Sequence, residues 1–411
     1  MPELMPLRGI HFDPERVGRD LGAVLSPPYD VVDDDHAILL EEKHPYNSVR
    51  LELCVPPADP APARYENAAA MWSSWRNEGV LVQDPAPSLY VYRHSFQHEG
   101  RRFVRTAIVG RLGGGVAPHE ETMAAPKEDR RRLLRACAAQ FSPILALYED
   151  PGGRVKSRVE AELKGRTAAL SASLGDEEIS LWRLDDEPTV AGLAADIAPL
   201  RAVIADGHHR YQSVRQYLEE RSGSDDRPGV LAALVATSDP GLLVLPTHRL
   251  IRARSEGIDL RIIDAVANSL GGRGEIIPLV DPSRPDFPRS LPKSGESETT
   301  FVAVSGGRSW LIRCECGIAG ALETMDGAIG IALEIGASSG PSGMIEYVQD
   351  TGWAMEEVLD GRAGAVILVP PVSLDEIISK ACQGKRFPRK TTYFYPKAPA
   401  GLLMLDLEPP R

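Results

Sequence analysis

One stretch of the sequence, residues 200–221 (LRAVIADGHHRYQSVRQYLEER), constrains the fold more than any other. Its apolar first third predicts a buried strand that stops at Asp206-Gly207. Beyond this turn, Val214 and Tyr217 recur at helical spacing and predict a helix that packs through that face. Because short strands and helices alternate along the rest of the chain without a repeat, we expect an α+β protein that contains this strand–turn–helix unit.

The turn between this strand and this helix carries several polar side chains. A helix that starts here presents unpaired N–H groups and the positive end of its dipole, which together bind anions. Gly207 permits close approach of the backbone, Arg210 can bond phosphate oxygens in pairs, and Asp206 can hold Mg²⁺. His208 and His209 are hydrogen-bond donors when they are protonated. The turn therefore predicts a site for the phosphates of a nucleotide.

Two other interpretations of this turn stay open on the residues alone. An Asp-Gly pair before a helix is often only a tight turn, and adjacent histidines often serve in capping or in ion pairs. The other interpretation is a metal site, in which His119 and His248 add ligands. Adjacent histidines point to different sides of a strand, and no HExxH or HxH spacing supports zinc.

The net charge, the apolar runs and the cysteines of the chain disfavour several classes of protein. Its 411 residues carry a net charge of −12, which is unsuited to wrapping nucleic acid or lying on an anionic membrane. No apolar run of about 18 residues predicts a membrane span, and the first residues lack the pattern of a secretory signal. The five cysteines are scattered, and Cys314-Glu315-Cys316 is not a CxxC pair. We therefore expect neither a disulfide framework nor structural zinc, and a cytoplasmic location.

Several other segments have clear periodicity. Residues 88–92 and 103–112 predict two paired strands around a polar turn. Polar and apolar residues alternate over residues 47–55, and this pattern predicts a further strand. Apolar residues on one face predict a helix over 127–141, and the apolar run 144–148 predicts a buried strand after it.

The residues DGHHR after an apolar strand resemble the ParB/sulfiredoxin-like superfamily. This superfamily includes nucleotide-dependent free-serine kinases, CTP-binding ParB proteins and ATP-binding sulfiredoxin. The kinases also carry a His-Glu pair well upstream of the turn, and in them the glutamate is the general base on the substrate hydroxyl. Residues 116–123 (VAPHEETM) supply such a pair here as His119-Glu120.

The whole chain also resembles the family known as the domain of unknown function number one thousand and fifteen. The motifs that carry this resemblance run nearly from end to end: SPPYDVV (26–32), PYNSVRL (45–51), HEETMAAPKEDR (119–130), QFSPI (140–144), IADGHHRY (204–211), THRLI (247–251) and RKTTYFYPKAPAGL (389–402). The family usually has a stretch like Met-Pro-Pro-Lys-Ser-Thr near its C-terminus, where this chain has FPRKTT at 387–392. That departure leaves the identity of the substrate open.

The resemblance implies three regions along the chain. A ParB/sulfiredoxin-like nucleotide-binding module is expected at 106–222, between an N-terminal α/β region at 1–105 and a C-terminal α+β region at 223–411. Within the last region, 281–298 is the most linker-like stretch because it is rich in proline and serine.

The resemblance also implies a reaction: phosphotransfer from ATP or ADP, with Mg²⁺, to free L-serine or a related hydroxy-amino acid. The partners are then a nucleotide and a small molecule, and neither nucleic acid nor a membrane. By position in the motifs, Glu120 is the base, Asp206 positions the metal ion, and His208 is a further catalytic residue. The phosphates are expected at Gly207, His208, His209, Arg210, Thr122, Lys127 and Arg130, and the acceptor at Asn47, Arg50, His248 and Lys390.

These residues also have plain structural interpretations. Glu120 and the acid after it suit a solvated first helical turn, Thr122 can cap that helix, and Arg130 can pair with Asp129. Arg50 can belong to an ion pair on a strand face. Two other functions stay open: a nucleotide-binding switch with weak hydrolysis, which would bind without acceptor-dependent turnover, and a metal-dependent phosphohydrolase.

Overall fold

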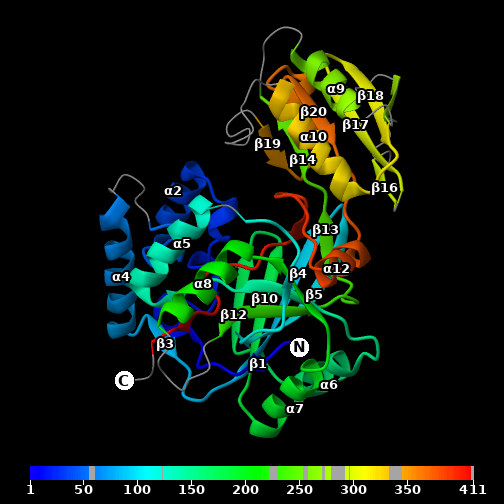
Figure 1. Cartoon of the computed structure of the whole chain (residues 1–411). Helices are drawn as coiled ribbons and strands as arrows, with labels where there is room; N and C mark the ends of the chain where they lie inside the picture. Colours follow the sequence, from blue (N-terminus) through cyan, green and yellow to red (C-terminus); the bar gives the residue numbers. More distant parts are fainter. Residues whose placement is uncertain are drawn as a thin grey trace. The chain divides into compact units, whose positions relative to one another are not determined.

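The chain forms two compact units (Figure 1). The computed structural model describes residues 1–54, 61–122, 124–221, 229–252, 258–270, 274–278, 292–295, 297–332 and 345–408. Unit 1 combines residues 1–243 with 396–411, and unit 2 is 244–395. The structure thus divides the chain differently from the three regions expected from the sequence, because both expected boundaries, at 105 and 222, fall inside unit 1.

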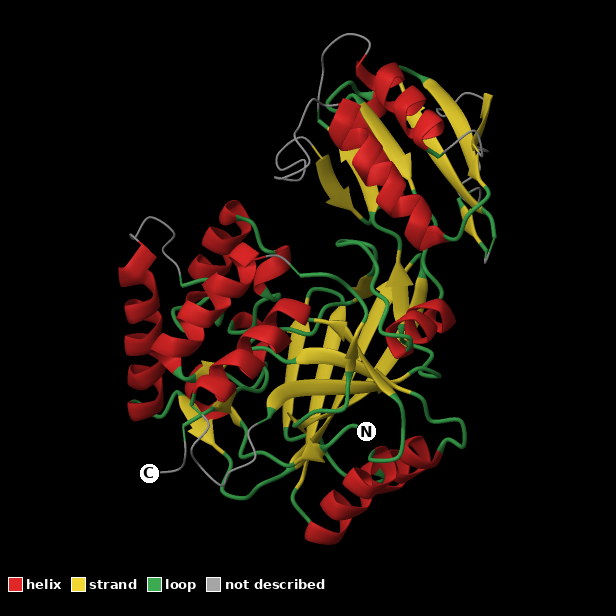
Figure 2. Cartoon of the chain, viewed as in Figure 1, coloured by secondary structure: helices red, strands yellow, loops and turns green. Residues whose placement is uncertain are grey.

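In the described part of unit 1, nine strands form one mixed sheet (Figure 2). The order across it is β6-β11-β8-β12-β5-β4-β10-β9, and β1 pairs with β5. The strands are β1 Leu4–Met5, β4 Leu89–His98, β5 Arg101–Leu112, β6 Ala117–Pro118, β8 Ile144–Tyr148, β9 Leu170–Leu174, β10 Glu177–Leu184, β11 Ala202–Asp206 and β12 Val230–Ala236. Strands β8 and β12 are buried at every position, which explains their continuous apolar runs.

The predicted pair of strands is confirmed as the hairpin β4–β5. Its two turn residues, Glu99 and Gly100, have φ of 48° and 72°. Two successive positive φ values give the tight turn whose twist matches that of the flanking strands. The predicted strand at 144–148 is confirmed as β8.

Helices cover the sheet of unit 1. Helices α5 and α8 pack against each other, α4 packs on α5, and α6 pairs with α7 (Figure 1). The helices are α1 Pro14–Val17, α2 Asp34–Lys43, α3 Val49–Glu52, α4 Ala61–Asn77, α5 Ala124–Cys137, α6 Arg154–Leu163, α7 Glu187–Ile197 and α8 His208–Glu220, with 3₁₀ turns at Leu21–Ala23 and Tyr29–Val31. Leu134 of α5, Leu193 of α7 and Val214 of α8 join one apolar core with the strands.

The strand predicted over residues 47–55 is wrong, because Val49–Glu52 forms helix α3. The Asn47 side chain accepts a hydrogen bond from the Val49 N–H at 3.0 Å, which starts a helical turn. The alternation in the sequence reflects the burial of Val49 and Leu51 in a short helix and not a pleated strand.

The last residues of the chain return to unit 1. Strand β22, Leu405–Asp406, pairs with β7, Ala139–Gln140, while β2, Ile10–Phe12, pairs with β3, Leu81–Gln83. Ala400 exchanges backbone hydrogen bonds with Ser26, and the Gly401 N–H donates to the Phe141 carbonyl at 2.9 Å. Three of the sequence motifs, 26–32, 140–144 and 389–402, therefore meet in one place.

Unit 2 is a second mixed structure of strands and helices. In its described part, β15-β18-β17-β20-β14-β19 form a sheet, with β16 paired to β17, and β13 pairs with β21. The elements are β13 Leu243–Leu245, β14 His248–Ile251, α9 Ile258–Ser269, β15 Gly274–Pro278, β16 Lys293–Ser294, β17 Thr299–Ser305, β18 Arg308–Cys314, α10 Ile318–Ala332, β19 Ile345–Val348, α11 Thr351–Leu359, β20 Ala365–Leu368, α12 Leu374–Cys382 and β21 Tyr393–Tyr395. Most of the linker-like stretch 281–298 lies outside the described residues.

Two expectations about the whole chain can be compared with the structure. The mixture of helices and strands is confirmed, whereas the ParB/sulfiredoxin-like character of the core stays a prediction. Cys314 and Cys316 are joined in a disulfide at the end of β18, a pair that the scattered cysteines did not predict. Among the helices in the described ranges, none combines the length and apolar composition needed to cross a bilayer.

The central position of β12 leads to a stability prediction. Leu234 is fully buried, so Leu234→Ala should lower the free energy of unfolding by about 2–5 kcal/mol. The same substitution at Leu39, which is 65% exposed on α2, should change it by less than about 0.5 kcal/mol. Urea unfolding followed by circular dichroism compares the two variants. Equal unfolding midpoints would contradict the burial of β12.

Candidate functional site

The candidate site lies at one edge of the large sheet in unit 1. Strands β6 and β11 are parallel, with Ala117 opposite Val203 and Pro118 opposite Ile204. Glu120 and Asp206 each follow two residues after the last paired position. Because parallel strands end at the same edge of a sheet, both acidic residues leave the sheet at the same edge. The fold thus brings the His-Glu motif next to the DGHHR turn, where His119 contacts His208.

The predicted strand–turn–helix unit is confirmed as β11, Gly207 and α8. Gly207 has φ 84° and ψ 30°, a left-handed conformation that glycine adopts without strain. A Cβ at this position would stand 3.0 Å from Ile144 Cγ2 and 3.1 Å from Arg210 Nε. No side chain caps the N-terminus of α8, so the first N–H groups of the helix are not satisfied by a cap.

Asp206 is the centre of a buried ion cluster. Its Oδ2 accepts from Arg210 Nη2 at 2.8 Å, and its Oδ1 accepts from Lys397 Nζ. The Lys397 ammonium also lies 3.8 Å from Asp30 Oδ2. Burial alone would raise the pKa of Asp206, but the charges of Lys397 and Arg210 outweigh it and hold this pKa far below its usual range.

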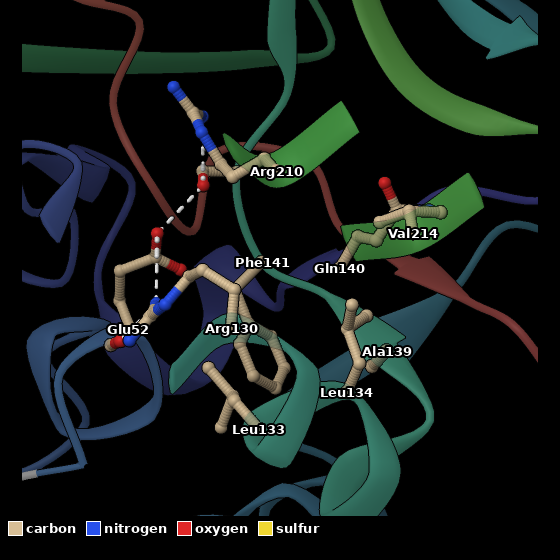
Figure 3. Close-up of a pocket in the computed structure, with 10 residues that line it drawn as sticks. Glu52, Arg130, Leu133, Leu134, Ala139, Gln140, Phe141, Arg210 and Val214 are labelled. Atoms are coloured by element: carbon tan, nitrogen blue, oxygen red, sulfur yellow. Dashed lines mark hydrogen bonds and ion pairs between the residues drawn. The ribbon is translucent and has the colours of Figure 1, made fainter. Parts of the chain in front are cut away.

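The Arg210 guanidinium continues the cluster into the interior (Figure 3). Its Nη1 donates to Ser142 Oγ at 3.1 Å and to the Pro143 carbonyl. Ser142 Oγ in turn donates to Glu52 Oε1 at 2.8 Å, and this carboxylate lies 3.9 Å from Arg130 Nη1. A chain of charge-assisted contacts therefore runs from Asp206 to α5.

A cavity of about 30 Å³ lies beside this chain of contacts (Figure 3). Its polar lining consists of Glu52, Arg130, Gln140, Ser142 and Arg210, and Leu133, Leu134, Ala139, Phe141 and Val214 complete it. A space of this size holds about one or two water molecules. It is therefore too small for a nucleotide.

Arg130, expected at the phosphates, is fully engaged by the protein. Its Nε donates to Asp129 Oδ2 at 2.8 Å, and its Nη1 donates to the Glu52 carbonyl at 2.7 Å. The guanidinium also stacks over the Tyr29 ring, 4.1 Å from its centroid. Since Arg130 is only 6% exposed, the geometry favours a structural role that ties α5 to α3 and to residues 29–31.

His208 and His119 form a buried, neutral pair. Their rings meet edge to face with centroids 4.6 Å apart, and the His119 N–H donates to His208 Nε2 at 3.3 Å. His119 Nδ1 donates to the Ile204 carbonyl at 2.6 Å. Burial lowers the pKa of His119 to about 4 and that of His208 well below 6.5. The expectation that His208 meets phosphates as a cation is therefore not supported by its surroundings.

The other expected phosphate contacts lie around the same edge. His209 is half-buried in the first turn of α8 and is near enough to influence the pKa of His208. Thr122 Oγ1 donates to Gln212 Oε1 at 2.9 Å. Lys127 is half-buried in α5, and its carbonyl accepts from Ser213 Oγ at 3.1 Å. The start of α5 and the first turns of α8 are thereby held together.

Asn47 and Arg50, expected at the acceptor, make structural contacts. The Asn47 side chain is fully buried and donates to the carbonyls of Ala23 and Leu25 at 2.9 and 3.2 Å. Arg50 pairs with the Glu41 carboxylate and donates to its carbonyl at 3.2 Å. These contacts lie within the N-terminal region and favour the structural interpretation of both residues, although Arg50 Nε is buried without a hydrogen-bond partner among the described residues.

His248 and Lys390 belong to unit 2, whereas the cluster around Asp206 belongs to unit 1. The buried His248 ring lies 2.8 Å from Thr351 Oγ1, and its Nδ1 accepts from the Val369 N–H at 3.1 Å. Lys390 has a positive φ of 57°. A role for either residue at the acceptor stays a prediction.

The residues around Asp206 do not suit a protein-held magnesium ion, although the sequence predicts one. Both carboxylate oxygens of Asp206 already bond to cationic side chains, Lys397 and Arg210. Across the part of the chain that the structure describes, no three His, Cys, Asp or Glu side chains are grouped to hold a metal. Mg²⁺ in such sites binds one or two carboxylates together with phosphate and water oxygens, so it would need an oxygen of Asp206 that is not bonded to a cation. Asp206 is therefore poorly suited to be a metal ligand.

Two residues of the cluster, Lys397 and Glu52, were not among the site residues expected from the sequence. Lys397 lies in the motif 389–402, but nothing in its neighbourhood predicts a partner 191 positions away. Glu52 falls in the segment that alternation assigned to a strand, and it is only 3% exposed. The motif QFSPI did carry a signal, because its Ser142 joins Glu52 to Arg210.

Comparisons with known proteins agree with the family expected from the motifs. The family model described as "Protein of unknown function (DUF1015)" matches residues 4–326. A mutant free serine kinase in complex with ADP is 14% identical over 74% of this chain and 92% of that chain, with a TM-score of 0.43.

Two further solved structures are similar at the same level. A free serine kinase in complex with AMP is 16% identical over 74% of this chain and 91% of its own, with a TM-score of 0.41. SbnI from Staphylococcus aureus, truncated at its C-terminus, is 10% identical over 74% and 87%, with a TM-score of 0.38. No curated protein matches. Similarity at this level assigns no role to any residue of this chain.

The buried histidine pair leads to a pH prediction. Because the folded-state pKa values lie below the ordinary 6.5, the unfolded chain binds more protons as the pH falls. This contribution to stability is present above pH 6.5 and is lost as the pH falls toward 4. For His119 alone it amounts to about 3 kcal/mol. Urea unfolding measured from pH 7 to 4 should show the loss.

His208→Gln keeps a hydrogen-bond acceptor but does not titrate, so its unfolding free energy should depend less steeply on pH over this range. His36→Gln, at an exposed position of α2, is the matched control and should follow the wild type. An unchanged slope in His208→Gln would show that His208 is not held neutral by its surroundings.

Proposed function

We propose that this chain, which belongs to the DUF1015 family, transfers a phosphoryl group from a nucleotide to the hydroxyl of a small molecule. Free L-serine or a related hydroxy-amino acid is the proposed acceptor, and ATP or ADP is the donor. The observation that carries the proposal is the shared sheet edge. It brings the acidic residue Glu120 to the same edge as the polar turn 206–210, at the start of a long helix.

Binding of the donor is supported by the start of α8. The first N–H groups of this helix have no side-chain cap, and its dipole favours an anion there. Arg210 Nε is buried and has no hydrogen-bond partner among the described residues. A Cβ at Gly207 would lie only 3.1 Å from this Nε, so the glycine lets the backbone of the turn approach the guanidinium closely. In the proposal, phosphate oxygens bond to these groups.

Glu120 is the proposed general base. As the hydroxyl oxygen of the acceptor attacks the terminal phosphorus, an O–P bond forms and the bond to the nucleoside diphosphate or monophosphate breaks. The hydroxyl proton passes to the Glu120 carboxylate, and the nucleotide leaves with the bonding electron pair. A positioned base of this kind contributes roughly 10²- to 10⁴-fold to the rate.

His208 has a positioning role in the proposal. Its neutral Nε2 accepts from the N–H of His119, the residue that immediately precedes Glu120. His119 is fixed a second time through Nδ1 and the Ile204 carbonyl on β11. These two hydrogen bonds fix the backbone that carries the base relative to the turn that binds the donor.

The test is acceptor-dependent phosphorylation. The purified chain is incubated with Mg²⁺, ATP or ADP, and a pool of amino acids and hydroxy acids, and mass spectrometry searches for phosphorylated products. Glu120→Gln should lower the rate by roughly 10²- to 10⁴-fold while nucleotide affinity is kept. Glu121→Gln, at the exposed neighbouring position, should keep the wild-type rate.

Each other outcome has a distinct meaning. Nucleotide binding without any phosphorylated product would favour the regulatory switch. Release of phosphate without an acceptor would favour a phosphohydrolase. Equal rates for Glu120→Gln and wild type would exclude Glu120 as the base, and absence of nucleotide binding would exclude the phosphate site at the turn.

A further inference from the structure

We infer that Cys314 and Cys316 form a reversible redox site in unit 2, at which a small thiol such as glutathione exchanges with the disulfide. The inference goes beyond the proposed function and does not depend on it, because the two cysteines belong to a different unit from the turn 206–210. It also gives a role to a disulfide that the sequence does not predict.

The first argument is the unequal exposure of the two cysteines, which lie where strand β18 leads into helix α10 of unit 2 (Figure 1). Cys314 is the last residue of β18 and is only 1% exposed, whereas Cys316 lies in the connection to α10 and is partly exposed. Of the two residues, Cys316 is therefore the one that a thiol from solution can attack. Thiol–disulfide exchange requires such an attack at one sulfur and the release of the other.

The second argument is that the surrounding backbone is held without the disulfide. Cys314 is paired with β15 on one side and with Thr299 of β17 on the other. The Thr299 hydroxyl donates to the Cys316 carbonyl at 2.8 Å, which anchors the second cysteine to the same strand. The Gly317 carbonyl accepts from the Ala321 N–H at 3.2 Å at the start of α10. We therefore expect the junction between strand and helix to keep its structure when the bond between the sulfurs opens.

The third argument is the small contribution of this bond to the stability of the chain. In the chain-entropy account, a disulfide stabilises a fold by closing a loop in the unfolded chain, and the gain grows with the length of the loop. Cys314 and Cys316 are two positions apart, so the loop contains only Glu315 between them. A bond that adds little to stability can open and close while the chain stays folded.

The other three cysteines do not combine these properties. Cys54 and Cys137 are buried, and burial raises the pKa of each thiol to about 12, so neither forms the reactive thiolate near neutral pH. Cys382 is exposed on α12 but is not part of a disulfide. Of the five cysteines, Cys314 and Cys316 alone form a bonded pair in which one member can be reached from solution.

The proposed exchange has two steps. In the first, a glutathione thiolate attacks Cys316 Sγ, a bond forms between these two sulfurs, and Cys314 leaves as a thiolate. In the second, another glutathione thiolate attacks the glutathione sulfur of the mixed disulfide, which releases oxidised glutathione and the Cys316 thiolate. Two electrons thus pass from two glutathione molecules to the protein, and the two cysteines take up the two protons that glutathione gives up. The reverse steps restore the bond.

The experiment equilibrates the full chain in glutathione buffers that run from oxidised to reduced and back. Iodoacetamide then blocks the thiols, and mass spectrometry of peptides counts the blocked cysteines. Wild type is compared with Cys382→Ser, which removes the exposed single thiol. In both chains Cys314 and Cys316 should pass from fully oxidised to fully reduced and return, while the circular dichroism spectrum stays the same. Cys54 and Cys137 should stay unblocked throughout.

Two single-cysteine variants test which sulfur is attacked. Cys314→Ser should form a mixed disulfide with glutathione at Cys316. Its Cys316 thiol should react with iodoacetamide at least about tenfold faster than the Cys314 thiol of Cys316→Ser, because a buried thiol reacts only after local opening of the chain. Equal rates would contradict attack at Cys316.

The titration decides the inference even if these variants fail to fold. A pair that stays oxidised in every buffer until the chain unfolds would overturn the inference and make the disulfide a structural one. A pair that stays reduced in oxidised glutathione would overturn it as well. Either result leaves the proposed phosphotransfer standing, because the titration involves neither a nucleotide nor an acceptor.

Discussion

A carboxylate at the end of a buried strand loses most of its hydration, so it needs compensating charge nearby. Asp206 is such a carboxylate. Lys397 of the C-terminal segment and Arg210 of the first turn of α8 supply the compensating positive charge. Removing one partner of such a buried pair leaves an uncompensated charge. The C-terminal segment, the turn and the interior contacts through Ser142 and Glu52 all depend on this one side chain.

Two buried arginines near this cluster, Arg130 and Arg210, differ in how many of their guanidinium nitrogens are hydrogen-bonded. The Arg130 guanidinium donates to Asp129 and to the Glu52 carbonyl and stacks on the Tyr29 ring. It thereby links helix α5 to helix α3. Arg210 is as deeply buried, yet its Nε stays unbonded among the described residues and lies beside a glycine. A buried donor without a partner is costly to a fold unless a ligand satisfies it.

The sequence predicts what depends on local patterns, and it fails where distant segments meet. The strand, turn and helix at 202–220 follow from periodicity and from glycine, and the hairpin β4–β5 follows from two alternating runs around a polar turn. The strand predicted over residues 47–55 does not form, because the hydrogen bond from the Val49 N–H to the Asn47 side chain starts a helical turn despite the alternation of apolar and polar residues. The partner of Asp206 lies 191 positions away, and no local signal specifies such a pair.

Unit 2 is inserted between the two parts of unit 1, since the chain leaves at residue 243 and returns at 396. A ribosome therefore releases the sheet, the turn and Asp206 long before it releases Lys397. During synthesis Asp206 therefore stays hydrated, or paired only with Arg210, until residues 396–411 have been made. The cluster can form only after unit 2 has been made, and a chain that stops after unit 2 would lack the Lys397 partner of Asp206.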